Sequence, residues 1–243
     1  NLALIYSAIG DYDKALEMYL ACLALREKIF GKEHPAYASS LGTLAVTYSL
    51  LGDYDNALEM NLACLAIRER LFGKEHPRYA RALGNISVIY SDLGDYDKAL
   101  EINLLCLALN EKIVGKEHPE YALSLTKLAQ TYYFLGDYDK ALKTSLESLA
   151  LYETILGEEH PDYATSLNNL ALTYSNLGDY DKALEMFLES LTLSEKLYGK
   201  EHPNYTTILN SVAMTYSYLG EYNKALELNL VCLSLREELF GKN

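Results

Sequence analysis

Tryptophan is absent from this 243-residue sequence, and proline occurs only five times. Basic residues are also scarce, with 21 against 34 acidic residues and a formal net charge of −13. Because proteins bind nucleic acids and anionic membranes by neutralising phosphate groups with Lys and Arg, we expect neither as a partner. The uncharged residues 35–52 include five serines and threonines, so we expect no membrane span there.

The cysteines are few and widely separated, at positions 22, 64, 106 and 232. Disulfide frameworks and zinc sites need clustered cysteines, so we predict neither here. The first three are 42 residues apart, and serine stands at the two skipped positions, Ser148 and Ser190. A position that accepts Cys or Ser indicates a small buried side chain, and reduced buried thiols favour a cytoplasmic protein. A signal peptide is also not apparent at the start of the sequence.

An internal repeat of 42 residues organises the whole sequence. Proline recurs at this spacing from Pro35 to Pro203. We therefore predict a single solenoid over residues 1–243, which starts inside a helix and is expected to be a fragment of a longer protein. The repeat boundaries are expected near Gly10, Gly52, Gly94, Gly136, Gly178 and Gly220.

Each repeat predicts two helices. The first, helix A, begins at a proline such as Pro35, where the missing N–H costs nothing, and ends before Gly52, which can adopt a positive φ. The second, helix B, follows the capping residue Asp53 and stops at Gly73. Because the connections are short, neighbouring helices should be antiparallel. We expect an all-α, right-handed superhelical solenoid of about six helix pairs, in which stacking buries the apolar faces.

The repeat resembles the tetratricopeptide repeat family. The resemblance rests on a helix A ending in Leu-x-x-x-Tyr-x-x-Leu-Gly followed by Asp-Tyr-x-x-Ala-Leu, as in Leu44 to Leu58, and it covers essentially the whole chain. The 42-residue period and the Gly-Lys-Glu-His-Pro link are similar to the long repeats of kinesin light chains. The segment 167–171 is also similar to the helix A motif of those proteins. The resemblance implies a scaffold that binds a peptide segment of a partner protein.

That resemblance also implies a concave groove lined by helices A, with helices B on the convex back. Asparagine amides can bind the N–H and C=O groups of an extended peptide, and apolar side chains between them can form pockets. The two candidate cations, Arg81 and Lys127, belong to different repeats, so we do not expect them to clamp a terminal carboxylate. The predicted groove residues are Arg81, Asn85, Val88, Lys127, Gln130, Asn168, Asn169, Leu172, Asn210 and Met214.

Charge predicts the kind of ligand. Residues 136–219 carry 13 acidic and five basic side chains, a net charge of −8. Because like charges slow association, we expect a ligand that is neutral or basic opposite this part of the chain.

No group of residues predicts catalysis. Each histidine precedes a proline in the link before helix A, so the five are expected to lie in different repeats, too far apart to share a metal ion. A catalytic site would interrupt the repeat, and no cluster of His, Cys, Asp or Ser does so. We therefore expect a protein that is not an enzyme and that needs no metal or cofactor.

Two alternatives to a peptide-binding scaffold remain open at this point. The repeats could instead be an architectural or regulatory segment that spaces domains of a larger protein. They could also drive self-association, because the terminal helices should expose apolar side chains that associate end to end. The side chains expected at these ends include Leu2, Leu230, Leu233 and Phe240.

Overall fold

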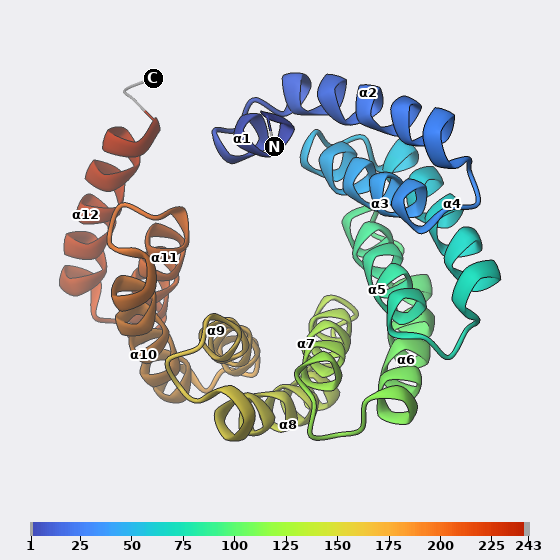
Figure 1. Ribbon diagram of the computed structural model, residues 1–243. Helices are drawn as coiled ribbons and strands as arrows, with labels where there is room; N and C mark the ends of the chain where they lie inside the picture. The colour runs from blue at the N-terminus through green and yellow to red at the C-terminus, as the bar shows by residue number, and fades with distance from the viewer. Residues whose placement is uncertain (1, 241–243) are drawn as a thin grey trace. The chain divides into compact units, whose positions relative to one another are not determined.

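The computed structural model describes the backbone of residues 2–240 and the side chains of residues 2–237. Its helices form two compact units, of which the first ends at Lys116 and the second begins at Glu117 (Figure 1). Within each unit, every helix packs chiefly against the helix before it and the helix after it. Each unit is therefore a stack of helix pairs, as the repeat predicted.

The first unit contains six helices. After a short α1, helices B and A alternate: α2, α4 and α6 are helices B, and α3 and α5 are helices A (Figure 1). Their bounds are α1 Leu2–Ala8, α2 Tyr12–Phe30, α3 Pro35–Leu50, α4 Tyr54–Phe72, α5 Pro77–Asp92 and α6 Tyr96–Ile113.

The second unit repeats the same alternation three times. Helices α7, α9 and α11 are helices A, and helices α8, α10 and α12 are helices B. Their bounds are α7 Pro119–Phe134, α8 Tyr138–Leu156, α9 Pro161–Asn176, α10 Tyr180–Tyr198, α11 Pro203–Tyr218 and α12 Tyr222–Phe240. The secondary structure of the described residues is entirely helical, which confirms the predicted all-α fold of six helix pairs.

The start of helix A is fixed by the histidine that precedes the proline. In α3, His34 is the N-cap and its Nδ1 atom accepts a hydrogen bond of 3.1 Å from the Ala36 N–H. The His34 ring also stacks on Phe30 at the end of α2, with ring centroids 4.6 Å apart. The link histidines therefore have a structural role: they satisfy a backbone N–H that the first turn leaves unpaired.

The turn from helix A to helix B depends on a glycine and an aspartate. Gly52 has a φ of +77°, which a residue with a Cβ atom rarely adopts, and it follows the last turn of α3. Asp53 then donates its N–H to Tyr48 O at 2.9 Å and accepts the Asn56 N–H on its carboxylate at 3.2 Å. Both predictions for this turn, the glycine after helix A and the capping aspartate, are confirmed.

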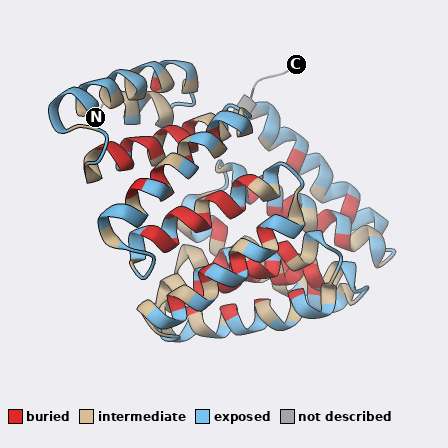
Figure 2. Cartoon of the chain, turned by 90° about the vertical axis from the view of Figure 1, so that its right-hand side faces the viewer, coloured by how far each residue is buried: buried red, intermediate tan, exposed pale blue. Residues whose placement is uncertain are grey.

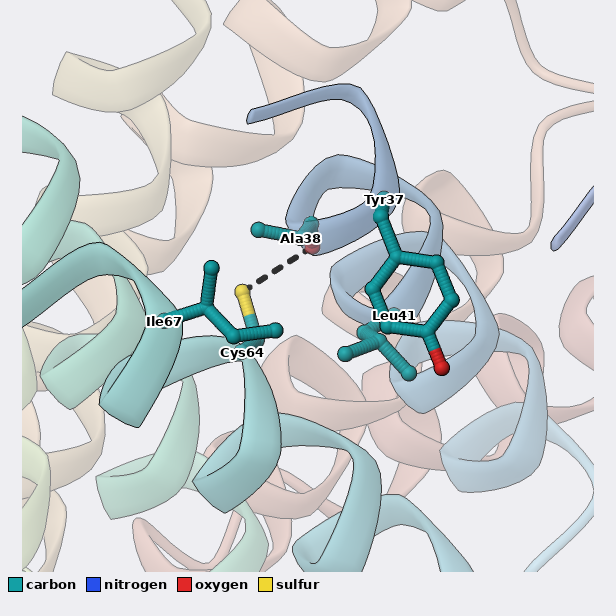
Figure 3. Packing of buried hydrophobic residues seen from close by; sticks show 5 residues of the cluster. All are labelled: Tyr37, Ala38, Leu41, Cys64 and Ile67. Atoms are coloured by element: carbon teal, nitrogen blue, oxygen red, sulfur yellow. Dashed lines mark hydrogen bonds between the residues drawn. The ribbon is translucent and has the colours of Figure 1, made fainter. Parts of the chain in front are cut away.

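Small residues let helix B approach the helix A before it. The Cys64 thiol donates to Ala38 O at 3.1 Å inside a core cluster with Leu41 and Ile67 (Figure 3). The hydroxyl group of Ser190 makes the equivalent bond to Ala164 O at 3.3 Å. The alternation of Cys and Ser thus reflects a small donor that reaches a helix carbonyl, as the spacing indicated. Figure 2 shows buried residues along the faces where helices meet and exposed residues on the faces turned outward.

Apolar side chains are exposed at the chain ends, as expected. Leu2 is 55% exposed, Leu230 is 59% exposed and Leu233 is 56% exposed, whereas the side chain of Phe240 lies outside the described residues. End-to-end association remains a prediction. In the part of the chain that the structure describes, each helix is too short or too polar to cross a bilayer.

Candidate functional site

In the first unit, a hollow of about 280 Å³ lies between α3 and α5, with α4 beneath it. We refer to it as the α3–α5 hollow. Val46 and Val88 give it an apolar rim, since they are 50% and 42% exposed. Its lining residues are Val46, Ser49 and Leu50 of α3, Asn61 of α4, and Asn85, Val88, Ile89 and Asp92 of α5.

The floor of the α3–α5 hollow carries polar groups. The Asn61 side chain is only 2% exposed, and its Oδ1 atom has no hydrogen-bond partner among the described residues. At the rim, Asp92 is exposed at the end of α5, where partial desolvation raises the pKa of its carboxyl group. A ligand in this hollow would therefore gain most by donating hydrogen bonds to these oxygen atoms.

The second unit contains a smaller hollow of about 90 Å³ between α7 and α9, the α7–α9 hollow. The Asn169 Nδ2 atom is buried there and finds no acceptor in the part of the chain that the structure describes. Phe134, which is 54% exposed, and Leu172 supply apolar surface. Its lining residues are Ala129, Gln130, Tyr133, Phe134, Ser145, Asn169, Leu172 and Thr173.

A further hollow of about 200 Å³, the α9–α11 hollow, lies between the next two helices A. Its floor is formed by α10, where Ser194 is 2% exposed and no described residue accepts from or donates to its Oγ atom. The residues that line it are Pro161, Ala164, Thr165 and Asn168 of α9, Ser190, Ser194 and Tyr198 of α10, and Asn204, Thr207 and Ile208 of α11.

A family model described as Tetratricopeptide repeat matches the chain in five overlapping segments, residues 1–70, 43–112, 92–154, 121–192 and 162–238. The chain belongs to this family. The predicted resemblance is therefore confirmed, and these repeats are tetratricopeptide repeats.

Solved structures of kinesin light chain type also resemble this tetratricopeptide repeat protein. One form of the nearly identical TPR-like repeats from a Podosopora anserina putative kinesin light chain is 25% identical over 84% of this chain and 97% of that chain, with a TM-score of 0.69. The protein BtubC (BKLC) from P. vanneervenii is 20% identical over 97% of this chain and 92% of that chain, with a TM-score of 0.73.

A third similar structure is that of a complex. It is a Rap protein complexed with Competence and Sporulation Factor, 16% identical over 98% of this chain and 73% of that chain, with a TM-score of 0.67. At this identity the likeness shows the shared fold. No curated protein sequence matches the chain.

Six of the ten groove residues predicted from the tetratricopeptide resemblance line these hollows. The structure places Asn85 and Val88 at the α3–α5 hollow, Asn168 at the α9–α11 hollow, and Gln130, Asn169 and Leu172 at the α7–α9 hollow. The other four lie on helices A outside the linings of these three hollows: Arg81 is exposed on α5, Lys127 is half-buried on α7, and Asn210 and Met214 are exposed on α11.

The floor residues Asn61 and Ser194 were not among the sequence predictions, because these considered helix A alone. Both lie on helices B of their tetratricopeptide repeats. A signal was present in the sequence: the position of Asn61 holds a different residue type in several repeats, namely Tyr19, Asn61, Asn103, Ser145, Phe187 and Asn229. The side chain at this position ranges from Ser145, which lines the α7–α9 hollow, to Phe187, which is 1% exposed in the core, so its size and polarity differ between the hollows.

Side chains that could ligate a metal lie apart in this tetratricopeptide fold. Among the described residues, no three His, Cys, Asp or Glu side chains lie close enough to hold a metal ion. The link histidines instead cap the helices A, as His202 does by accepting the Asn204 N–H at 3.2 Å.

Proposed function

We propose that this protein is a cytoplasmic, non-catalytic scaffold that binds an extended segment of a partner protein in the hollows between its helices A. One observation carries the proposal: each of the three hollows contains a buried polar atom that lacks a hydrogen-bond partner among the described residues, namely Asn61 Oδ1, Asn169 Nδ2 or Ser194 Oγ. Such atoms are rare in folded proteins because each costs about 1–3 kcal/mol. A ligand that supplies the missing partner removes this cost.

The chemistry of these atoms fits a peptide backbone. Asn61 Oδ1 needs a donor such as a peptide N–H, whereas Asn169 Nδ2 needs an acceptor such as a peptide C=O. Asn85 and Gln130 add amide groups beside them. An extended chain can supply either partner within one unit, because its N–H and C=O groups are unpaired and point sideways.

Exposed apolar side chains on helices A provide surface against which the side chains of the bound segment can pack. Val88, Phe134 and Met214 are 42%, 54% and 47% exposed on helices A. Because these side chains are already about half buried, covering one with a ligand contributes roughly 1 kcal/mol. The complex that a Rap protein forms with Competence and Sporulation Factor supports the use of this fold for binding another molecule.

The competing function is an architectural segment that spaces domains or self-associates, without a dedicated peptide site. The exposed side chains of Leu230 and Leu233 on α12 favour it, because a second copy or another domain could cover them. This alternative predicts that the hollows bind nothing selectively.

A selection experiment separates the two functions. A displayed library of random 12-residue peptides is enriched on the whole protein, and the enriched peptides are synthesised and titrated by fluorescence anisotropy. For peptides that bind the α7–α9 hollow, we expect the double variant Gln130→Ala, Asn169→Ala to weaken binding at least about tenfold, since each buried hydrogen bond to an amide contributes roughly 1 kcal/mol. The matched control is Thr154→Ala, an exposed residue of the helix B α8.

Two outcomes would contradict the peptide-binding proposal. The library could fail to enrich any sequence, or the enriched peptides could bind the double variant and the wild type equally. In either case light scattering of the whole protein over a range of concentrations would test the alternative, which predicts a mass that grows with concentration.

A further inference from the structure

One position near the end of helix B determines how the space in front of the next helix A is filled. In chain order, its occupants in the six repeats are Arg26, Arg68, Asn110, Tyr152, Ser194 and Arg236, each 42 residues after the one before. Arginine is the commonest occupant and Ser194 is the smallest. The α9–α11 hollow lies directly over Ser194.

In the first unit, arginine at this position binds the first turn of the next helix A. Arg26 Nη1 donates to Ala36 O at 2.9 Å and to Ser40 Oγ at 2.8 Å. One repeat later, Arg68 Nη1 donates to Arg78 O at 2.8 Å. The same backbone carbonyl position thus accepts a guanidinium group in two successive repeats.

An aromatic ring and a second guanidinium group complete this arrangement in the second repeat. The Arg78 guanidinium lies over the ring of Phe72, 5.1 Å from its centroid. This is a favourable cation–π distance. The space between α4 and α5 therefore contains two guanidinium groups, one bonded to a carbonyl oxygen and one stacked on a ring.

The α9–α11 hollow retains the backbone carbonyl and the aromatic ring that contact these arginines, but it lacks the arginines, and Ile208 stands where Ser40 is in the first unit. By the 42-residue spacing, Ser194 replaces Arg68, Asn204 replaces Arg78 and Tyr198 replaces Phe72. The Tyr198 ring is 42% exposed, and the Ser194 Oγ atom at the floor is without a partner among residues 2–237. The result is a space of about 200 Å³ beside an aromatic ring and a buried hydroxyl group that lacks a described hydrogen-bond partner.

We propose that the α9–α11 hollow binds the guanidinium group of an arginine side chain supplied by a partner protein. The guanidinium donates to Ser194 Oγ and to the carbonyl oxygen of Asn204, which occupies the position of Arg78 O, and it stacks against the Tyr198 ring. The amide oxygen of Asn168, which lines the same hollow, is a further acceptor.

Charge favours the same ligand. The ten described residues that line the hollow are all uncharged, so a cation meets no basic side chain among them. Residues 136–219, which include α9 and α10, carry a net charge of −8 that attracts a cation over a longer range. Arginine suits the site better than lysine, because its planar group has five donors and stacks on aromatic rings.

The inference rests on the proposed function only in that the arginine belongs to a bound segment of a partner. The test therefore uses a probe that needs no peptide site: arginine blocked as its N-acetyl methylamide. Side-chain amide signals of Asn168 and Asn204 in the ¹⁵N-labelled protein are followed by NMR during titration. We expect saturable shifts, with blocked lysine and blocked citrulline each at least about tenfold weaker, since charge-assisted bidentate bonds are the stronger ones.

A variant that refills the hollow provides the decisive comparison. Ser194→Arg introduces the arginine that two earlier repeats have at this position, Arg26 and Arg68. We therefore expect the variant to fold, to melt at a higher temperature and to lose the shifts caused by blocked arginine. The matched control is Thr192→Arg, which adds the same charge at an exposed position of α10 and should bind the probe like the wild type.

Some results would overturn the inference. Blocked citrulline or blocked tyrosine binding as tightly as blocked arginine would do so, as would shifts that persist in a folded Ser194→Arg variant. The outcome for the proposed function is separate: peptides that depend on Gln130 and Asn169 but not on an arginine would leave the scaffold proposal standing. Binding of blocked arginine without any selected peptide would support the pocket and contradict the peptide scaffold.

Discussion

The two units share one backbone pattern but fill the space between their helices with different chemistry. In the first unit, Arg68 and Cys64 lie between α4 and its neighbours and donate to backbone carbonyl groups. In the second unit, the equivalent residues of α8 are Tyr152, which is 1% exposed, and Ser148, which is fully buried. A repeat framework therefore tolerates large changes at these positions while its turns stay the same.

The second unit adds a network of buried hydroxyl groups. The oxygen atoms of Thr126 and Ser148 are 2.7 Å apart, and that of Ser166 lies 3.2 Å from Thr126. Burial raises the pKa of the neighbouring Tyr152 to about 12, because the phenolate form would lose its hydration. Both units make side-chain bonds to the backbone at these positions, as Ser148 does to Ala122 O, and the second unit adds hydrogen bonds between side chains of three successive helices.

The largest expected effect on stability comes from substitution at one helix B position, which holds Asn61 in α4 and Phe187 in α10. Phe187 is 1% exposed in a core cluster with Ile208 and Val212, so Phe187→Ala should lower the free energy of unfolding by about 3–5 kcal/mol. Asn61→Ala should change it by at most about 1 kcal/mol, because the Oδ1 atom of Asn61 makes no hydrogen bond to a described residue.

Hydrogen exchange of helix amides measures both effects locally, which matters because repeat proteins can unfold in parts. Loss of protection should be confined to α9–α12 in the Phe187 variant. Equal losses for the two variants would break the comparison, since they would mean that the two units depend equally on this position.

A smaller effect is expected from the buried hydroxyl network. Ser148→Ala should lower the free energy of unfolding by about 1–3 kcal/mol, because it removes the partner of the Thr126 hydroxyl and of Ala122 O. Cys64→Ser gives the first unit the residue that the second unit has at this position. It should leave the free energy of unfolding nearly unchanged, since a hydroxyl can also donate to Ala38 O. Urea denaturation followed by circular dichroism measures both. A large loss for Cys64→Ser would show that this position depends on sulfur packing rather than on the hydrogen bond.

The sequence was sufficient to predict the framework that the two units share. Pro35, Gly52 and Asp53 have local roles at helix ends, and each role depends on a property of that residue type alone. The same reasoning predicted a small buried side chain at Cys64, because the alternation of cysteine and serine at this position is visible in the sequence.

The hollows could be predicted only in part. Asn85 and Leu172 were found because they lie on the helix that the family resemblance indicated. The importance of Ser194 could not be inferred from its own helix, since the hollow forms only because Asn204 and Ile208 of the next helix A do not fill the space over this small side chain. Such a space becomes apparent only when the helices are packed together.

The smallest expected effect concerns a helix A position that is glycine in the first unit and polar in the second. Gly42 lies inside α3, where an added Cβ would meet Arg68 Nη2 and Cys64 Sγ at 3.8 Å, an ordinary contact distance. Gly42→Ala should therefore raise the free energy of unfolding by about 0.5–1 kcal/mol, because alanine loses less backbone freedom on folding. The control, Gly178→Ala, should lower it by about 1–2 kcal/mol, since Gly178 has a φ of +82°. Thermal melting of both variants measures the difference, and a destabilised Gly42→Ala would mean that the Arg68 side chain needs the space that glycine leaves.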